Sequence, residues 1–168
     1  MPIPHFCHQC GGRLRERFLP GEQRARLVCE ICGFIHYLNP RVVAASIPER
    51  DGRVLLMRRA LEPRRGYWTF PGGFLEVGET AQEGARREAE EEVSISVEPG
   101  AILGAYTRRE AGIVVVVFRA KAREGEPRAG EEALEVRWFT PEAIPWEELA
   151  FPTTEQALRD WVKGRRSR

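Results

Sequence analysis

The chain has 168 residues, 42% hydrophobic and 30% charged, a composition typical of a folded globular protein with a substantial core. Its 26 basic and 25 acidic side chains leave a net charge of +1, which gives no reason to expect a nucleic-acid or membrane partner. The first residues lack the features of a signal peptide, and no apolar run reaches the roughly 20 residues of a membrane helix. We therefore expect a cytoplasmic protein.

All four cysteines lie near the start of the chain, in two pairs with two residues between the members of each pair: Cys7, Cys10, Cys29 and Cys32. This spacing is typical of a tetrahedral zinc site, and four thiolate ligands leave no position for water, so the zinc would be structural. Gly11 and Gly33 follow the pairs and allow the positive φ of a tight metal-binding turn. Disulfides and buried free thiols are the alternatives, and disulfides do not suit a chain without a secretion signal.

The same segment holds arginines and an aromatic residue, a combination that favours nucleic-acid binding. These residues are Arg13, Arg15, Arg17, Arg24, Arg26 and Phe18. Glu16, Glu22 and Glu30 are interspersed among them, and a solvated charged face is the interpretation that we favour. We expect His5, His8 and His36 to be surface residues rather than ligands.

After Asn39-Pro40 the pattern alternates between strands and helices. Strands are predicted at 42–47 and 54–57, joined by the hairpin turn Arg50-Asp51-Gly52, and again at 102–107, 112–120 and 136–139. The apolar run within 112–120 suits a central strand. Helices are predicted at 81–93 and 153–163, a helical turn at 141–144 and a polar loop at 124–130. We divide the chain into a zinc ribbon (1–38), an α/β domain (39–164) and a frayed tail (165–168).

The predicted helix at 81–93 begins with a capping box, because Thr80 can accept from the backbone N–H of Glu83 while Glu83 reaches back. Glu88, Glu91 and Glu92 follow at spacings that place three carboxylates on one helix face. Their repulsion destabilises the helix and raises the pKa of at least one carboxyl group. Bound Mg²⁺ or Mn²⁺ would remove this repulsion and activate a water for attack at phosphorus. The alternative is a solvated acidic face.

The segment from Gly73 to Ile95 resembles the Nudix box, whose pattern is G-x5-E-x7-R-E-U-x-E-E-x-G-U, with U an aliphatic residue. The matching residues are Gly73, Glu79, Arg87, Glu88, Glu91, Glu92 and Ile95, with Ala89 as a small apolar residue. Ser94 stands where the pattern has glycine. If that glycine serves a left-handed helix end, serine costs about 1 kcal/mol or shifts the turn.

The resemblance implies the α/β class, with a Nudix α/β/α sandwich around a mixed sheet after the zinc ribbon. It implies that the chain is a pyrophosphohydrolase acting on phosphorus-containing acid anhydrides. The three metal ligands would be Glu88, Glu91 and Glu92, and one of the last two would also orient the water. Arg87 would hold the acidic cluster, and Glu79 would steady the loop.

Further roles follow from the same resemblance. Gly72 and Gly73 would let the backbone pass near the phosphates. The general base of this family sometimes lies outside the box, and Glu132 and Glu135 are candidates, with an ordinary strand-edge charge as the alternative for each. Tyr67, Trp68 and Phe74 could stack on a base or flavin, although a core position is the favoured interpretation of Trp68. Arg58, Arg59, Arg64 and Arg65 could bind phosphate; at least two of them would be plain surface charges.

A zinc ribbon before a Nudix domain also resembles the bacterial NADH pyrophosphatases, but the SQPWPFPxS-like motif of that group is absent after the box. A proline found after the box in the ADP-ribose hydrolases is replaced by Ala111. The whole chain is more similar to plant chloroplast FAD/ADP-ribose pyrophosphatases and their bacterial relatives. FAD, ADP-ribose or a similar dinucleotide or ADP-sugar is therefore the expected substrate. NADH, NAD-capped RNA and nucleoside triphosphates are the alternatives.

A different class of protein, a sensor that binds a nucleotide or RNA without hydrolysing it, would not need three metal-binding glutamates. Because all three are present, we favour the enzyme. A homodimer is common in the family, although nothing in the sequence identifies an interface.

Overall fold

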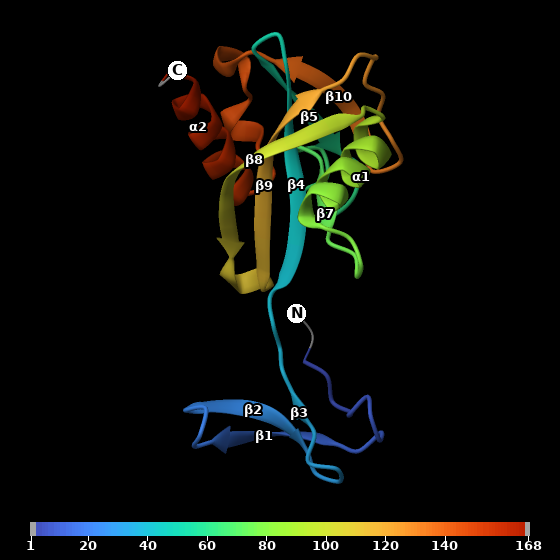
Figure 1. Ribbon diagram of the computed structural model, residues 1–168, viewed down its shortest axis with the longest axis vertical. Coiled ribbons are helices and arrows are strands. Elements are labelled where there is room, and N and C mark those ends of the chain that lie inside the picture. Colours follow the sequence, from blue (N-terminus) through green and yellow to red (C-terminus); the bar gives the residue numbers. More distant parts are fainter. Residues whose placement is uncertain (1–2, 167–168) are drawn as a thin grey trace. The chain divides into compact units, whose positions relative to one another are not determined.

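The computed structural model describes residues 3–166, and the contacts divide the chain into two compact units, Met1–Pro40 and Arg41–Arg168. Figure 1 shows a small all-β unit built from the N-terminal residues and an α/β unit built from the rest. Among the described residues, no helix is long and apolar enough to cross a membrane.

The small unit is an antiparallel sheet of three strands, β1 (Leu14–Leu19), β2 (Arg24–Cys29) and β3 (Ile35–His36). Its core is small: one cluster joins the buried Cys7, Leu14 and Cys29 with Leu27 and Phe34 packed against them, and Val28 is also buried. A core of this size stabilises a fold only weakly, and units of this kind usually depend on a metal or on disulfides.

The large unit is built on a mixed sheet of seven strands. Five of them lie in the order β10 (Ala133–Phe139), β5 (Arg53–Arg59), β4 (Arg41–Arg50), β9 (Ile113–Ala122) and β8 (Val97–Arg108). The short β6 (Trp68–Thr69) pairs with β5, and β7 (Gly72–Phe74) pairs with β4. β4 and β9 run parallel, whereas the other pairs run antiparallel. The apolar β9 lies inside the sheet between β4 and β8, as its sequence predicted.

Two helices cover opposite faces of this sheet, with α1 (Ala81–Val93) on one side and α2 (Pro152–Arg166) on the other (Figure 1). Ala89 and Val93 of α1 pack against Leu55 and Met57 of β5. The cluster on the α2 side includes Ile47, Leu56, Val117, Ala157, Leu158 and Trp161. Three short 3-10 helices, η1 (Arg109–Ala111), η2 (Pro141–Ala143) and η3 (Trp146–Glu148), complete the unit. The predicted α/β/α sandwich is confirmed.

The predicted helix at 81–93 is α1, and the predicted hairpin turn is present, with positive φ at both Asp51 and Gly52. β8 begins at Val97 rather than at 102. Proline is tolerated on an edge strand such as β8, and a register shift between Pro99 and Ile102 absorbs the irregularity.

The end of the chain also differs from the expectation. α2 continues through Arg166, so residues 165 and 166, which we expected in a frayed tail, are helical. The single weak helix former there, Gly164, is not enough to end a helix. Residues 167 and 168 lie outside the described residues.

Candidate active site

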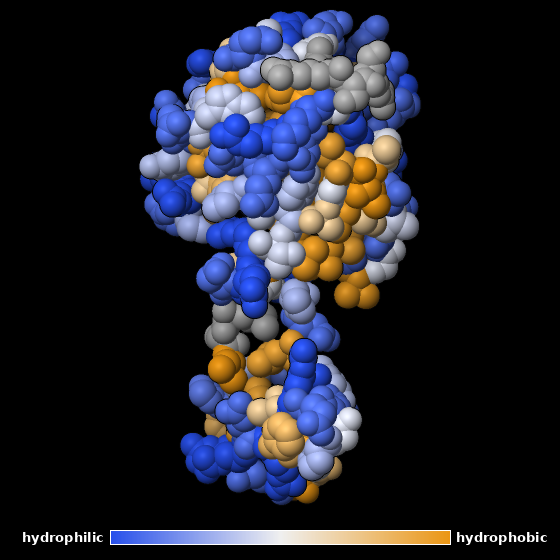
Figure 2. Space-filling view, turned by 90° about the vertical axis from the view of Figure 1, so that its left-hand side faces the viewer, coloured by the Kyte–Doolittle hydropathy of each residue, from blue (hydrophilic) through white to orange (hydrophobic). Residues whose placement is uncertain are grey.

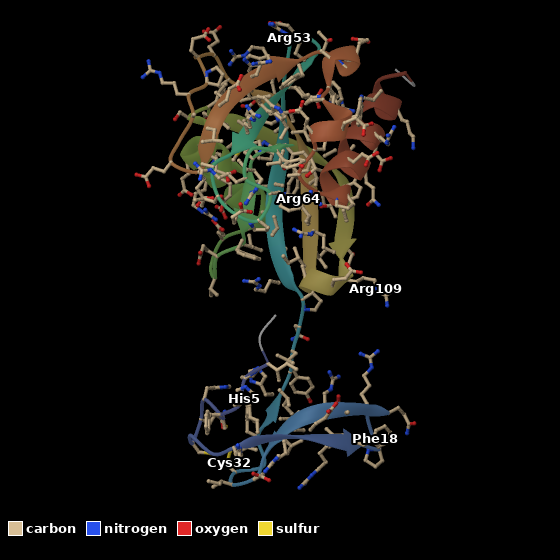
Figure 3. The ribbon with its side chains drawn as sticks, turned by 180° about the vertical axis from the view of Figure 1, so that it is seen from behind. His5, Phe18, Cys32, Arg53, Arg64 and Arg109 are labelled. Atoms are coloured by element: carbon tan, nitrogen blue, oxygen red, sulfur yellow. The ribbon has the colours of Figure 1, made fainter. Side chains whose placement is uncertain are left out.

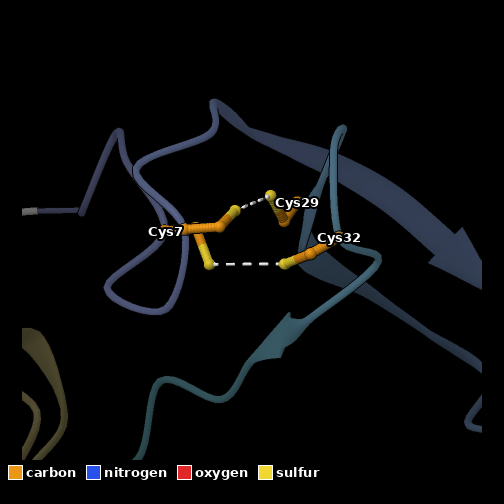
Figure 4. A group of neighbouring side chains, drawn as sticks. Cys7, Cys29 and Cys32 are labelled. Atoms are coloured by element: carbon orange, nitrogen blue, oxygen red, sulfur yellow. Dashed lines mark hydrogen bonds between the residues drawn. The ribbon is translucent and has the colours of Figure 1, made fainter.

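The four cysteine sulfurs converge at one place in the small unit (Figure 4). The cysteines are free, and their Sγ atoms all lie within 4.8 Å of one another. The Cys7–Cys32 pair is 3.8 Å apart and the Cys10–Cys29 pair 3.5 Å apart. A tetrahedral zinc with Zn–S bonds of about 2.3 Å requires sulfur–sulfur separations of about 3.8 Å, so this group fits zinc.

The backbone around the cysteines supports this geometry. Gly11 and Gly33 have φ values of 72° and 71°, the left-handed conformation predicted for the two turns. A hydrogen bond from the backbone N–H of Cys32 is the main cause that lowers the pKa of Cys29 to about 6. Because the thiolate is the form that binds metal, the turn prepares this sulfur as a ligand.

The predicted capping box holds the start of α1 in place. The backbone N–H of Glu83 donates to the Thr80 hydroxyl at 3.2 Å, and the Thr80 N–H donates to the Glu83 carboxylate at 2.8 Å. Gly84, Ala85 and Ala89 are buried, and such small residues let the helix lie close to the sheet. The helix thereby presents its glutamate face beside β7.

Glu92 is a buried acidic residue, with 6% of its surface exposed. Its carboxylate accepts a hydrogen bond of 2.8 Å from the backbone N–H of Gly72. Burial raises the pKa of Glu92 to about 8, and the charges of Glu88 and Glu132 act in the same direction, against the hydrogen bond from Gly72. A buried carboxyl group beside other carboxylates is an environment that a bound cation relieves.

Arg87 links the loop before α1 to the glutamates on the helix. Its Nε and Nη2 donate to Glu79 at 3.2 and 2.8 Å, and Nη2 also donates to the carbonyl oxygen of Phe74 at 3.2 Å. Nη1 donates to Glu88 at 2.7 Å and to Glu91 at 3.1 Å. The bonds from Arg87 lower the pKa of Glu79, whereas burial raises the pKa of Glu88.

Gly73 and Gly72 occupy positions where a larger residue does not fit. A Cβ atom on Gly73 would lie 2.3–2.5 Å from the carboxylate atoms of Glu88, and one on Gly72 would lie 2.4 Å from the Cβ of Ala45. β7 therefore passes directly against both the helix glutamates and β4. No side chain separates the backbone at Gly73 from the Glu88 carboxylate.

The polar loop predicted at 124–130 ends against the C-terminus of α1. Arg128 and Gly130 donate from their backbone N–H groups to the carbonyl oxygens of Val93 and Glu92, at 3.0 and 2.9 Å. A Cβ on Gly130 would lie 2.2 Å from the carbonyl oxygen of Glu91. Glu132, which follows this attachment, acts electrostatically on both Glu88 and Glu92.

The glutamate oxygens are gathered less tightly than the cysteine sulfurs. Within the described part of the chain, the cysteines are the only group of three or more ligand-type side chains whose donor atoms converge. Glu91 has a side chain that is 59% exposed and paired with Arg87. Glu135, the second candidate base, is hydrogen-bonded to Arg137 instead. Carboxylate oxygens are the ligands that a hard cation prefers. The glutamate side chains would have to move closer together to bind one ion.

The aromatic candidates divide between core and surface. Trp68 is buried at 4% exposure and packs edge-to-face on Phe139, so it is a core residue, the interpretation favoured from sequence. Phe74 is 40% exposed, and the guanidinium of Arg41 lies 4.0 Å from its ring centre. Tyr67 is exposed to a similar degree. The last two rings remain available for stacking.

The arginine candidates also take different positions. Arg58 donates from Nε to the carbonyl oxygen of Gly66 at 2.7 Å, which ties it to the loop before β6. Arg59 and Arg108 both place guanidinium groups near the Phe151 ring, at 5.3 and 4.1 Å from its centre. No local pattern indicated the pairing of Arg108 with Phe151, because they are distant along the chain and only the fold brings them together.

Two surface hollows lie away from these residues. One is lined by β4, β8 and β9 residues such as Glu49, Glu98 and Arg119, and the other includes Gln82 and Arg86 on the outer side of α1. Neither is lined by the three box glutamates. The site is located by its carboxylates and by Arg87.

Comparisons with known proteins identify the family of the chain. Residues 38–162 match the family model described as the NUDIX domain, and residues 5–38 match the one described as Nudix N-terminal, a zinc ribbon. The chain belongs to the Nudix hydrolase family. The predicted family resemblance is therefore confirmed over both units.

Individual relatives of this Nudix hydrolase cover different shares of the chain. A crystal structure of a Nudix hydrolase from Nitrosomonas europaea has a TM-score of 0.92 and 39% identity, covering 98% of this chain and 93% of that one. An ADP-ribose pyrophosphatase from Methanocaldococcus jannaschii is 33% identical over 76% of each chain. An NAD-capped RNA hydrolase, NudC, from Vibrio vulnificus is 32% identical over 83% of this chain and 52% of its own length.

The chain spans only part of some of these relatives. It matches 64% of the length of a MutT-like protein from Streptomyces ambofaciens and about half of the Vibrio vulnificus NudC.

Proposed function

We propose that this Nudix hydrolase cleaves the diphosphate linkage of a nucleoside diphosphate derivative, such as FAD, ADP-ribose or a similar dinucleotide or ADP-sugar. The observation that carries the proposal is the burial of Glu92 next to Glu88 and Glu132, on the helix face that Arg87 organises. The relative named ADP-ribose pyrophosphatase supports the substrate class. The products would be two nucleotide or phosphate-ester fragments.

In this proposal, Glu88, Glu91 and Glu92 hold Mg²⁺ or Mn²⁺. Held by these residues, such a cation would supply Lewis-acid polarisation of the diphosphate oxygens and activation of a water. Arg87 keeps the loop fixed against the helix, because its guanidinium binds both Glu79 of the loop and Glu88 of the helix. Because Gly73 has no side chain, the Glu88 carboxylate can lie directly against the backbone of β7.

Glu132 is our candidate for a general base outside the box. It interacts electrostatically with Glu88 and Glu92. Glu135 is engaged by Arg137, which makes it the weaker candidate. Glu132→Gln is expected to slow hydrolysis by about 10²–10⁴-fold, the usual contribution of a general base, whereas Glu135→Gln should have little effect.

The proposed substrate-binding residues are Gly72, Gly73, Phe74 and Arg58. Phe74 offers a half-exposed ring beside the box, and Arg58 lies on the strand that leads into the loop before β6. Zinc in the four-cysteine site would have a structural role, and its thiolates suit the reducing environment of the cytoplasm. A homodimer stays a prediction.

The decisive experiment is a product-release assay with Mg²⁺ or Mn²⁺ and a set of substrates: FAD, ADP-ribose, NADH and nucleoside triphosphates. The double variant Glu91→Gln/Glu92→Gln serves as the blank, and Glu90→Gln, an exposed glutamate of the same helix, serves as the matched control. Metal-dependent turnover of one dinucleotide or ADP-sugar, lost in the blank and kept in the control, is expected. Binding without turnover of any substrate would favour a sensor instead.

A further inference from the structure

The strand register of the small unit sorts its charged residues between two faces. Arg17 stands directly opposite Arg26, Arg15 opposite Val28, and Leu19 opposite Arg24. Residues that face each other in an antiparallel pair lie on the same side of the sheet, and alternate residues share a side. Four arginines therefore lie on one face, which we call the arginine face: Arg15, Arg17, Arg24 and Arg26.

Acidic residues balance only part of this charge. Arg26 pairs with Glu22 at 2.8 Å and Arg15 with Glu30 at 3.1 Å. Arg17 and Arg24 form no ion pair within the described residues. Arg17 also stands opposite another arginine, an arrangement that destabilises a sheet because like charges repel. An anionic ligand would remove this cost.

The two faces differ in chemistry as well as in charge. By the same alternation, Glu16 and the exposed Phe18 lie on the side opposite the arginine face. Tyr37, half-exposed, lies on the arginine side, with the guanidinium of Arg26 at 5.0 Å from its ring centre. Figure 3 labels Phe18 and Cys32 at opposite ends of the small sheet, so the hairpin end lies away from the cysteine end.

We propose that the arginine face binds the phosphate backbone of single-stranded nucleic acid. Planar guanidinium groups match phosphate oxygens with paired hydrogen bonds, and an aromatic ring among them offers a surface on which a base can stack. A membrane surface is the weaker match, because membrane binding also needs exposed apolar residues on the basic side. Leu19, Val28 and Ile35 of that side are partly or fully buried.

The test uses the full zinc-loaded chain with the Glu91→Gln/Glu92→Gln changes, so that hydrolysis does not disturb the measurement. Fluorescence anisotropy would follow binding of labelled single-stranded RNA of about 12 nucleotides, with DNA of the same sequence as a second arm. If four arginines each neutralise one phosphate, affinity should fall about 50-fold between roughly 50 and 200 mM salt. Binding of either oligonucleotide with this salt dependence supports the proposal.

The variant Arg17→Glu/Arg24→Glu should lower the affinity on the order of tenfold or more and roughly halve the salt slope, because two phosphate contacts are lost. Arg17→Lys/Arg24→Lys should keep most of the affinity. Arg53→Glu/Arg128→Glu, which makes the same change in net charge in the large unit, is the matched control and should bind like the parent. Circular dichroism and zinc content would verify that each variant is folded.

Three results would overturn the proposal. One is the absence of salt-dependent binding to both oligonucleotides, and the second is an equal loss in the arginine-face variant and in the control. The third is tight binding to anionic phosphatidylserine vesicles without binding to either oligonucleotide. None of these results would affect the proposed diphosphate hydrolysis, which is measured separately on small substrates.

Discussion

The two proposed metal-binding regions differ in how much of each site is formed by the protein alone. In the small unit, the four sulfurs already lie within 4.8 Å of one another, but few apolar residues support them. In the Nudix unit, apolar clusters cover both faces of a wide sheet. Arg87 bridges Glu88 and Glu91, and Glu92 is buried.

The proposed zinc would therefore stabilise the fold of the small unit, whereas the proposed cation of the Nudix unit would bind to a domain that is already folded. The small unit cannot gain enough stability from burial, so the free energy of metal binding becomes free energy of folding. The larger core of the Nudix unit can offset the cost of carboxylates held in an unfavourable arrangement until a cation binds. On the face that Figure 2 shows, hydrophilic residues predominate and apolar residues gather in patches on each unit.

The largest expected effect is the loss of zinc. Structural zinc sites contribute about 10–16 kcal/mol of binding free energy, so Cys10→Ser should unfold the small unit and leave the Nudix unit folded. Cys10 is exposed, so the change removes a ligand and little packing. Hydrogen exchange measured by mass spectrometry should find rapid exchange in β1 and β2 and unchanged protection in β4 and β9. Persistent protection in β1 and β2 would contradict the conclusion that the small unit depends on zinc for its fold.

The second effect concerns Glu92 without divalent cations. Its folded pKa of about 8 lies above the ordinary 4.5, so its contribution to stability is complete below about 4.5 and is lost as the pH rises through 8. Glu92→Gln should remove this pH dependence and raise the free energy of unfolding above pH 8 by about 2–5 kcal/mol. Urea unfolding in EDTA measures this, with Glu90→Gln as the control. Added Mg²⁺ should stabilise the parent more than Glu92→Gln; equal stabilisation would argue against Glu92 as a ligand.

A smaller effect is expected from Gly73→Ala. The added methyl group would meet the Glu88 carboxylate, and overpacking of this kind costs about 1–3 kcal/mol. Because Glu88 must move, hydrolysis should fall as well. Gly100→Ala is the matched control, since its Cβ would make only an ordinary contact with the Arg119 carbonyl oxygen. Thermal unfolding and the product-release assay check both, and equal effects of the two variants would rule out the close contact as the cause.

The smallest effect is expected at the end of α1. Ser94 has φ of 52° and ψ of 35°, the left-handed conformation in which the family pattern has glycine. Ser94→Gly should therefore raise the free energy of unfolding by about 0.5–1 kcal/mol, because glycine adopts this conformation without steric cost. Thermal melts would detect the change as a higher midpoint, and a lower midpoint would mean that the serine side chain makes a compensating interaction.

Local patterns were enough to predict the parts of the chain whose causes are local. The bounds of α1 followed from the Thr80–Glu83 capping box and the helical spacing of its residues, and the Asp51-Gly52 turn from its strong hairpin preference. The predicted start of β8 was wrong because Pro99 and Gly100 normally indicate a turn. The strand can contain these two residues because it lies at the edge of the sheet.

In the candidate site, too, only the features with local causes were predictable from the sequence. Spacing placed the three glutamates on one face and Arg87 beside them. It could not distinguish Glu132, whose charge acts on Glu92, from Glu135, because the position of Glu132 follows from the attachment of Gly130 to α1. The bond from Gly72 to Glu92 joins residues on different elements, and no pattern within either segment encodes it.

The attachment of residues 128–130 to the end of α1 also divides the neighbouring loop into two parts with different tolerance to insertion. Positions around the exposed Glu126 precede the attachment, so added residues there can extend into solvent without moving the helix. One extra residue between Gly130 and Ala133 would instead shift Glu132 relative to the helix. We expect the first position to accept an affinity tag or a fused domain, which would allow the enzyme to be immobilised on a support with both chain termini left unmodified.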